Sequence, residues 1–148
     1  MLAHVLLAVL AAASTTGPAR GEVKPAAAAA VVRQSALPVA TGVRATLGRP
    51  ACPSGVTDRV GAVFQCTVPI GDATVPFLVR IGPTAMTASQ HWAVIPAATV
   101  AVVAGAGARC GTRKVVTGPP GSAVTCTVAG RTVLVRITSL SGALERIV

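Results

Sequence analysis

The chain has 148 residues, of which 52% are apolar and 2% aromatic, and its 13 Lys or Arg against 4 Asp or Glu give a formal net charge of +9. This length suits one domain or two very small ones. Four carboxylates and two His in the whole chain leave little material for acid–base catalysis, so the composition argues against most classes of enzyme.

Residues 1–21 have the pattern of a secretory signal peptide. An apolar, Leu- and Ala-rich stretch covers residues 1–13, and small-x-small cleavage sites lie at residues 11–13 and 19–21. The stretch of about 12 apolar residues is too short to cross a bilayer of roughly 30 Å. A buried N-terminal helix is the alternative, but nothing in the sequence caps or continues it. We therefore expect a secreted or extracytoplasmic protein of the cell envelope.

An Ala- and Pro-rich segment, residues 22–42, follows the leader. Pro25 and the alanine-rich run up to Ala36 are typical of a short helix that has Pro in its first turn and ends before Pro38. The same composition also suits a disordered spacer. The sequence leaves both interpretations open.

The rest of the chain contains one pattern twice. Cys-Thr-Val occurs at residues 66–68 and 126–128, and Val-Arg-Ile at residues 79–81 and 135–137, with a Gly turn between them in each copy. Such self-similarity indicates tandem modules. We predict two Cys-stapled modules, at residues 43–96 and 97–148. The class is α+β, with a short helix, a three- to four-stranded antiparallel sheet and one disulfide in each module.

Alternating apolar and polar residues predict the strands of both modules. In the first, Val75, Phe77, Val79 and Ile81 share one face of a strand that pairs as a hairpin with residues 62–68. The second module repeats this pattern. Further expected elements are a helix at residues 97–104 and strands at residues 90–95 and 143–148. Pro76 cannot donate a ladder hydrogen bond, so we expect its strand to be an edge strand or to bulge there.

The four cysteines are expected to form structural disulfides. Cys52 and Cys110 precede Cys66 and Cys126 by similar spacings. Four cysteines allow three pairings, and the repeat favours the one within each copy, Cys52 with Cys66 and Cys110 with Cys126. Each bond would contribute about 3 kcal/mol in the chain-entropy model. A metal site or a redox pair is disfavoured because no C-x-x-C occurs, and we expect no cofactor and no metal.

The first copy resembles a known family through its cysteine, glycine and strand motifs. These motifs are Cys52-Pro53, Gly61 followed by Phe64-x-Cys66-Thr67-Val68, the Gly71-Asp72 turn and the Val79-Arg80-Ile81 strand. They resemble the small secreted actinobacterial domain of unknown function 4333. The second copy diverges, with Gly111 after Cys110 and Val124 at the position of Phe64. The resemblance implies a small extracytoplasmic α+β domain with one disulfide and brings no known activity or catalytic residues.

The excess of positive charge points to an anionic partner. The predicted contact residues lie on outward strand positions, loops and turns: Arg59, Arg80, Arg113, Lys114, Arg131 and Arg136. An anionic cell-wall polymer, lipid head groups or an envelope protein would suit this charge. Nucleic acid is disfavoured because few aromatic side chains are present for stacking on bases. The plainer alternative is a solvated surface that keeps an apolar chain soluble.

No catalytic motif is present. His91 is the one His after the leader, the carboxylates Glu22, Asp58, Asp72 and Glu145 are scattered, and the chain has no Gly-x-Ser-x-Gly elbow, phosphate-binding loop or dinucleotide fingerprint. The uncharged run at residues 92–108 contains Pro96 and two glycines and is too short to span a membrane, so we expect no transmembrane segment in the mature chain.

We therefore expect a noncatalytic exported binding or structural module. An inhibitor or sequestering protein for a secreted enzyme, acting through a stapled loop at residues 53–60 or 112–121, is the alternative. An enzyme with His91 as its base ranks last.

Overall fold

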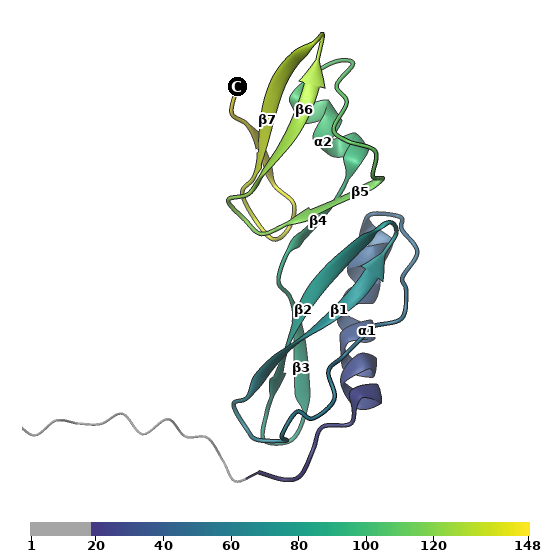
Figure 1. Ribbon diagram of the computed structural model, residues 1–148, viewed down its shortest axis with the longest axis vertical. Helices are drawn as coiled ribbons and strands as arrows, with labels where there is room; N and C mark the ends of the chain where they lie inside the picture. The colour runs from purple at the N-terminus through teal and green to yellow at the C-terminus, as the bar shows by residue number, and fades with distance from the viewer. Residues whose placement is uncertain (1–18) are drawn as a thin grey trace, which may run out of the picture.

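The computed structural model describes residues 19–148, which form two helices and eight strands (Figure 1). In chain order these are α1 (Pro25–Gly42), β1 (Val63–Ile70), β2 (Ala73–Ile81), β3 (Met86–Gln90), β4 (Ala93–Pro96), α2 (Ala97–Ala104), β5 (Val115–Gly118), β6 (Ala123–Val128), β7 (Arg131–Ile137) and β8 (Leu144–Arg146). Three antiparallel sheets have the strand orders β1-β2-β3, β4-β5 and β6-β7-β8. The predicted α+β class is confirmed. Most of the predicted signal peptide, residues 1–18, lies outside the described residues.

Helix α1 is longer than the sequence predicts. It begins at Pro25 as expected, but it runs through Pro38 and ends at Gly42. The expected end before Pro38 and the alternative of a disordered spacer are therefore both wrong for this segment. Pro38 is exposed. The backbone carbonyl that loses its helix hydrogen bond because of Pro38 therefore lies on the solvent side, where water can replace that bond.

The inner face of α1 is lined by small side chains. Ala28, Val32, Ala36 and Ala40 recur at every fourth position and are at most 1% exposed. This spacing places one residue per turn on the same face of a helix. They pack in one apolar cluster with the inward residues of the first sheet. Because alanine is small, α1 lies close to the sheet and leaves no room for larger side chains.

Alternation sets the two faces of the first sheet. Val75, Phe77, Val79 and Ile81 of β2 are buried, while Arg80 between them is exposed. This is the alternation that the sequence predicts. The buried face lies against α1, and the opposite face of the sheet points away from the helix (Figure 1).

Pro76 lies in the central strand, which contradicts the expected edge position or bulge. β2 pairs regularly with β1 on one side and β3 on the other, and Thr67 is the partner of Pro76. Thr67 exchanges both backbone hydrogen bonds with Ala51 rather than with β2, so the nitrogen of Pro76 points away from β1. On its other side β3 has already ended at Gln90, and only the carbonyl of Pro76 is used, by the His91 N–H. No acceptor therefore lies opposite the nitrogen of Pro76, and the absence of an N–H there costs the sheet no hydrogen bond.

The predicted strand at residues 90–95 is instead the end of β3 and most of β4. His91 and Trp92 form the link between these two strands. β3, Met86–Gln90, was not foreseen, because its small and polar side chains alternate only between half-buried and exposed. β8 covers the middle of the strand expected at residues 143–148, and α2 covers the helix expected at residues 97–104.

The β4–β5 ribbon joins the two apolar clusters. Val94 and Val115 pack in the cluster that contains α1 and the first sheet. Ala93 and Ile95 pack in the cluster that contains α2 and the third sheet. Successive residues of a strand point to opposite faces, so each face of this ribbon is buried in a different cluster.

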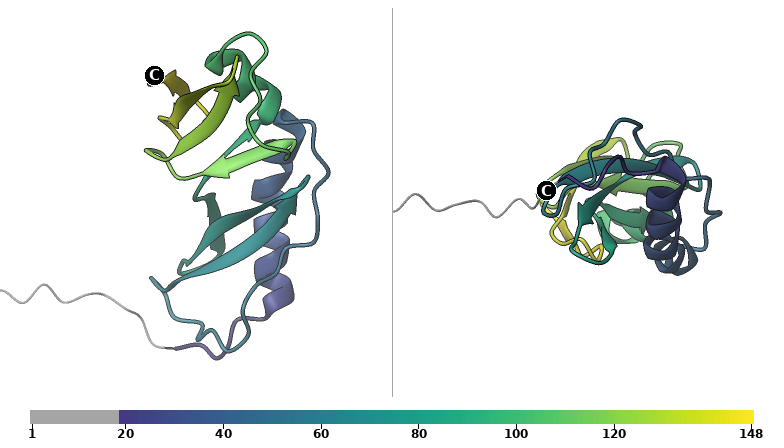
Figure 2. Two further views of the ribbon diagram at one scale, coloured as in Figure 1. Left: turned by 45° about the horizontal axis from the view of Figure 1, so that its top comes forward. Right: turned by 90° about the horizontal axis from the view of Figure 1, so that it is seen from below.

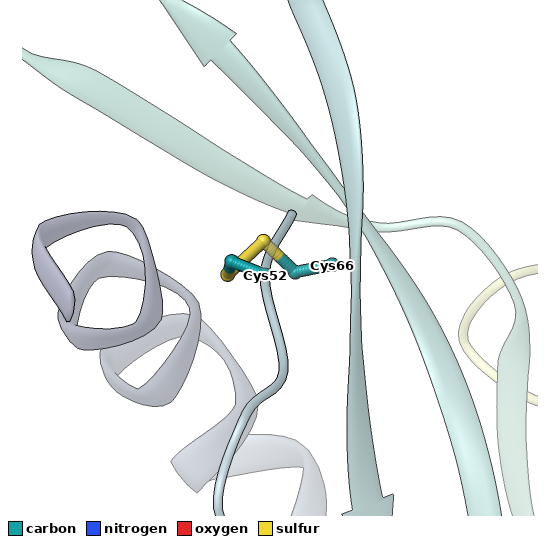
Figure 3. The surroundings of a disulfide bond; sticks show 2 residues. All are labelled: Cys52 and Cys66. Atoms are coloured by element: carbon teal, nitrogen blue, oxygen red, sulfur yellow. A yellow bond between two sulfur atoms is a disulfide. The ribbon is translucent and has the colours of Figure 1, made fainter. Parts of the chain in front are cut away.

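Each cluster contains one disulfide. The structure forms the within-copy bonds, Cys52–Cys66 and Cys110–Cys126. Cys66 and Cys126 are completely buried on β1 and β6, and the Cys52–Cys66 bond lies between α1 and the sheet (Figure 3). Each bond ties the segment that runs along the outer edge of a hairpin to its neighbouring strand.

The same backbone contacts recur within each half of the structure, the half with the first sheet and the half with the third sheet. Next to the disulfides, Ala51 pairs with Thr67 and Arg109 pairs with Thr127. The Gly61 N–H donates to the Ile81 carbonyl at 2.8 Å, and the Gly121 N–H donates to the Ile137 carbonyl at 2.7 Å. The segments before and after each sheet are therefore anchored at matched positions.

Because the buried face of α1 packs closely against the sheet, we expect an Ala→Leu substitution on that face to lower stability more than the same substitution on the exposed face. Ala36→Leu places a larger side chain against the sheet and is expected to lower the free energy of unfolding by about 1–3 kcal/mol. Ala30→Leu makes the same change on the exposed side of α1 and is expected to stay within about 0.5 kcal/mol of wild type. Urea unfolding followed by circular dichroism measures both. Equal effects of the two changes would contradict close packing on the buried face.

Candidate binding surface

The third sheet is open on the same side of the molecule as the first. α1 and α2 both lie behind the hairpins β1–β2 and β6–β7, in the view of Figure 1 and in the left view of Figure 2. The uncovered sheet faces carry hydroxyl side chains among apolar ones: Thr74, Thr87, Ser89, Thr125, Thr127 and Thr132 are exposed, whereas Leu78 and Leu134 are half-buried and Pro76 is buried. We call these two faces together the open face. It can donate and accept hydrogen bonds along the length of the molecule.

Arg80 and Arg136 occupy corresponding positions on the open face. Arg80 is in the central strand β2, between Val63 of β1 and Thr87 of β3. Arg136 is in the central strand β7, between Ala123 of β6 and Glu145 of β8. Both side chains are exposed. The chain thus presents a guanidinium group at the corresponding position of each central strand.

The two arginines differ in their neighbours. The guanidinium of Arg136 lies 3.7 Å from the carboxylate of Glu145, and these side chains are 48% and 60% exposed. An exposed pair at this distance is weak, because water and salt screen it. Arg80 faces Thr87 at the equivalent place and takes part in neither ion pair of residues 19–148. Arg80 is therefore the freer of the two for an external anion.

The other predicted contact residues are exposed but do not join one cluster. Arg59 precedes the first sheet, Arg113 and Lys114 lead into β5, and Arg131 begins β7 beside the β6–β7 turn. They belong to three separate segments of the chain. The structure therefore brings together matched single cations on the open face rather than one basic patch.

Asp72 holds the turn of the first hairpin against β5. Its carboxylate accepts hydrogen bonds from the backbone N–H of Lys114 at 2.7 Å and of Val115 at 3.0 Å. The hydrogen bond from Lys114 is the main cause that lowers the pKa of Asp72, and Val115 and the positive charge of Arg113 act in the same direction. Gly71 beside it has a φ of +59°, and a Cβ there would lie 3.0 Å from Cγ2 of Val115. A larger residue would push the turn away from β5.

Gln90 makes a second connection between the halves. Its side-chain amide donates to the Trp92 carbonyl at 2.6 Å and to the Leu140 carbonyl at 3.3 Å. Nearby, a Cβ on Gly142 would lie 3.2 Å from Cγ1 of Ile95, so the loop before β8 lies close against β4. The two sheets are thus connected at the Asp72 turn, at Gln90 and through the β4–β5 ribbon.

The residues considered for acid–base chemistry lie apart. Asp58 forms an ion pair with Arg20 at 2.9 Å, Asp72 accepts the two backbone N–H groups, and Glu145 lies beside Arg136. His91 is exposed in the link between β3 and β4, where its backbone N–H donates to Pro76. The described residues contain no group of three or more His, Cys, Asp or Glu side chains placed to hold a metal.

The open face has no aromatic side chain among the described residues. Phe77 is completely buried, and Phe64 packs against the first cluster on the inner face. Trp92 is half-buried in the link between β3 and β4.

Comparisons with known proteins give no match: no family model, curated protein or solved structure matches this chain. Within residues 19–148, none of the helices has both the length and the apolar character needed to cross a membrane.

Sequence reasoning missed the role of Asp72. The sequence indicates Asp72 as part of a Gly-Asp turn and as one of four scattered carboxylates, whereas its carboxylate contacts backbone groups some forty positions later in the chain. One signal was present. By the strand pairing, the corresponding turn in the second copy has Gly130 where the first has Asp72, and the loss of a carboxylate at one turn position indicates different surroundings.

The Asp72 contact predicts a pH-dependent connection between the halves. A carboxyl whose pKa is lower in the folded state than in the unfolded state stabilises the folded state at neutral pH. This contribution is lost as the pH falls below about 4. The amide proton shifts of Lys114 and Val115, followed by NMR, are expected to titrate with a midpoint below the usual value for Asp. Asp72→Asn is expected to abolish this titration, and a normal or raised midpoint in wild type would contradict the contact.

Proposed function

We propose that this protein is an exported, noncatalytic binding module of the cell envelope that contacts an anionic envelope component. The observation that carries the proposal is the placement of Arg80 and Arg136 at corresponding, exposed positions in the central strands of two sheets. A guanidinium group has five donors arranged to fit carboxylate or phosphate oxygens. Two such groups in the same context suit a partner that offers repeated anionic groups.

Extracytoplasmic location is the second part of the proposal. Both disulfides support it, because such bonds persist in oxidising compartments. The signal-peptide pattern of residues 1–21 and the resemblance of the first copy to the secreted domain of unknown function 4333 point the same way. The backbone contacts shared by the two halves support an arrangement of two related modules.

The alternative of an enzyme inhibitor receives less support. An inhibitory loop has to be free to enter the partner enzyme. Within the loop at residues 53–60, Val56 and Asp58 pair with the backbone of residues 20–23. The loop at residues 112–121 contains β5, whose Val115 is buried and held by Asp72. Both candidate loops are thus largely engaged by their own chain.

Retention on isolated envelope tests the proposal. Arg80→Gln with Arg136→Gln removes two charges from the open face. At about 1 kcal/mol for each charge near an anionic surface, the double variant is expected to bind about thirtyfold more weakly at low salt. Its binding should also depend less on salt. Sedimentation of labelled protein with envelope, over a range of salt concentrations, measures both effects.

The matched control is Arg33→Gln with Arg49→Gln. These two exposed arginines line a hollow between α1 and the segment before β1, on the helix side of the sheet. The control has the same net charge as the test variant and is expected to keep most of the binding. If both variants lose envelope binding equally, the binding depends on net charge alone and not on the positions of Arg80 and Arg136. Undiminished retention of the test variant would overturn the proposed function.

If the protein is exported, the contacts of Arg20 indicate where the signal peptide is cleaved. The Arg20 guanidinium donates to Asp58 at 2.9 Å and to the Pro83 carbonyl at 2.7 Å, and its backbone N–H donates to the Asp58 carbonyl at 2.7 Å. Cleavage after Gly21 would remove these contacts, whereas cleavage after Ala13 keeps them. We expect the secreted chain to begin before Arg20, as the intact mass of exported protein will measure. A mature chain that begins at Glu22 would contradict this.

A further inference from the structure

We infer that the outer edge of β5 binds an extended, acidic peptide segment of another protein, which is added to the β4–β5 ribbon as a third strand. This site goes beyond the proposed function, because it uses neither Arg80 nor Arg136. Three observations carry it: backbone groups of β5 that point away from β4, a hollow beside this strand, and a carboxylate that the same edge already holds.

The direction of the backbone groups of β5 follows from its pairing with β4. The Ala97 N–H donates to the Lys114 carbonyl, and Val116 lies two positions further along the same ladder. In an antiparallel pair, every second residue bonds to the partner strand, and the residues between them point the other way. Val116 therefore bonds to β4, whereas the backbone groups of Val115 and Thr117 point outward.

One of these outward groups already holds a carboxylate. The Val115 N–H donates to Asp72 at 3.0 Å, which confirms its outward direction. Three outward groups remain, the Val115 carbonyl and the N–H and carbonyl of Thr117, and within residues 19–148 none of them has a hydrogen-bond partner. An added strand would form its backbone hydrogen bonds with these groups.

The edge of β3 differs, because the protein itself covers part of it. The His91 N–H donates to the Pro76 carbonyl, and by the same alternation the Ala88 carbonyl points outward. This carbonyl accepts a hydrogen bond from the Ser35 hydroxyl of α1 at 3.1 Å. In the part of the chain that the structure describes, no side chain does the same for the outward groups of Thr117.

A hollow of about 440 Å³ borders β5. It is lined by Val115, Val116 and Thr117 and by the segment at residues 110–113. Pockets that hold small molecules measure about 300–1,000 Å³, so this hollow has room for side chains of an added strand. Such a strand would contact the 110–113 segment as well as the backbone edge.

The end of β5 limits the length of the bound segment. β5 ends at Gly118, and Pro119 and Pro120 follow it in the chain. Proline has no N–H and cannot extend the edge as a donor. At the other end, Asp72 occupies the Val115 N–H. The edge therefore accepts a short segment, about three to five residues at the spacing of a β-strand.

The charges beside this edge favour an acidic segment. Arg113 lines the hollow, and no Asp or Glu does. Besides the hydrogen bond from the Lys114 N–H, the positive charge of Arg113 lowers the pKa of Asp72, so Arg113 lies near the same end of the edge. Arg113 and Lys114 are both exposed, and together they exceed the single negative charge of Asp72. A carboxylate on the bound segment would meet a guanidinium that can donate two hydrogen bonds to it.

Hydrogen exchange followed by NMR tests the edge directly. The probe is a capped pentapeptide, threonine-valine-glutamate-valine-threonine, added to the complete exported chain. In the free protein we expect the Thr117 amide to exchange faster than the Val116 amide, which donates to β4. On addition of the peptide the Thr117 amide should become protected. Unchanged exchange at Thr117, or shift changes confined to β3 or β8, would overturn the assignment.

Thr117→Pro removes the outward N–H and leaves the bonds between β4 and β5 in place. Thr117→Val is the matched control, because both changes remove the hydroxyl that donates to the Ala93 carbonyl, and only proline removes the N–H. We expect Thr117→Pro to weaken peptide binding about tenfold and Thr117→Val to change it less than about twofold. Calorimetry measures both affinities. Equal effects of the two changes would show that the backbone edge is not used.

N-methylation of the peptide makes the same test without changing the protein. Methyl groups on the backbone nitrogens of alternate residues block one edge of the peptide and leave the other edge free. We expect one of the two alternately methylated peptides to keep most of its affinity and the other to lose about tenfold. Equal affinities would mean that no strand is added. Circular dichroism shows whether Thr117→Pro is folded, and the methylated pair decides the question if it is not.

Arg113→Gln tests the preference for an acidic segment. Wild type is expected to bind the glutamate peptide about fivefold more tightly than the same peptide with glutamine in the central position. Arg113→Gln should bind both peptides equally. Arg33→Gln, which removes the same charge from the helix side of the first sheet, should keep the preference. No preference in wild type, or an unchanged preference in Arg113→Gln, would show that the acidic assignment is wrong.

A second copy of this chain is the other strand that could pair with β5. In that case the Thr117 amide would become protected as the protein concentration rises without peptide, and sedimentation analysis would show a dimer. This result would overturn the peptide as the occupant of the edge. Retention on envelope through Arg80 and Arg136 does not depend on β5, so each of these outcomes leaves the proposed function to its own test.

Discussion

The burial of both faces of the β4–β5 ribbon is the constraint on which the rest of this structure depends. Val94 and Val115 lie in one apolar cluster, and Ala93 and Ile95 lie in the other. A ribbon in this position needs apolar side chains at successive positions, which Ala-Val-Ile provides in β4. Neither cluster can release the ribbon without exposing apolar surface. The relative orientation of the two sheets, and so of their open faces, follows from this.

The turn of the first hairpin adds a polar contact to this junction that the second hairpin does not make. Only an acceptor can satisfy the two backbone N–H groups at the start of β5, and Asp72 supplies two carboxylate oxygens. Gly130, at the corresponding position of the second hairpin's turn, has no side chain and cannot make the same contact. The two hairpins have similar strands, but their turns are not interchangeable. The difference between the halves therefore lies where one contacts the other.

The local sequence pattern predicted the strands and their buried faces better than it predicted which segments they pair and pack with. Alternation in residues 74–81 was sufficient to identify the buried face of β2, since strand geometry alone determines it. The position of Pro76 in a central strand was not predictable, because it depends on Thr67 bonding to Ala51 and on β3 ending at Gln90. The Asp72 contact and the shared side of Arg80 and Arg136 likewise depend on how separate hairpins pack, which no local pattern encodes.

The charge of +9 is distributed over single residues, of which Arg80 and Arg136 lie on the open face. Asp58, Asp72 and Glu145 each contact groups of their own chain, and only Glu145 lies on the open face. At physiological salt the field of an exposed charge falls off within about 8 Å, so an anion near Arg80 is affected mainly by Arg80. The backbone repeats a guanidinium at corresponding positions of β2 and β7. The two sheets provide that repetition, and the junction between them fixes its spacing.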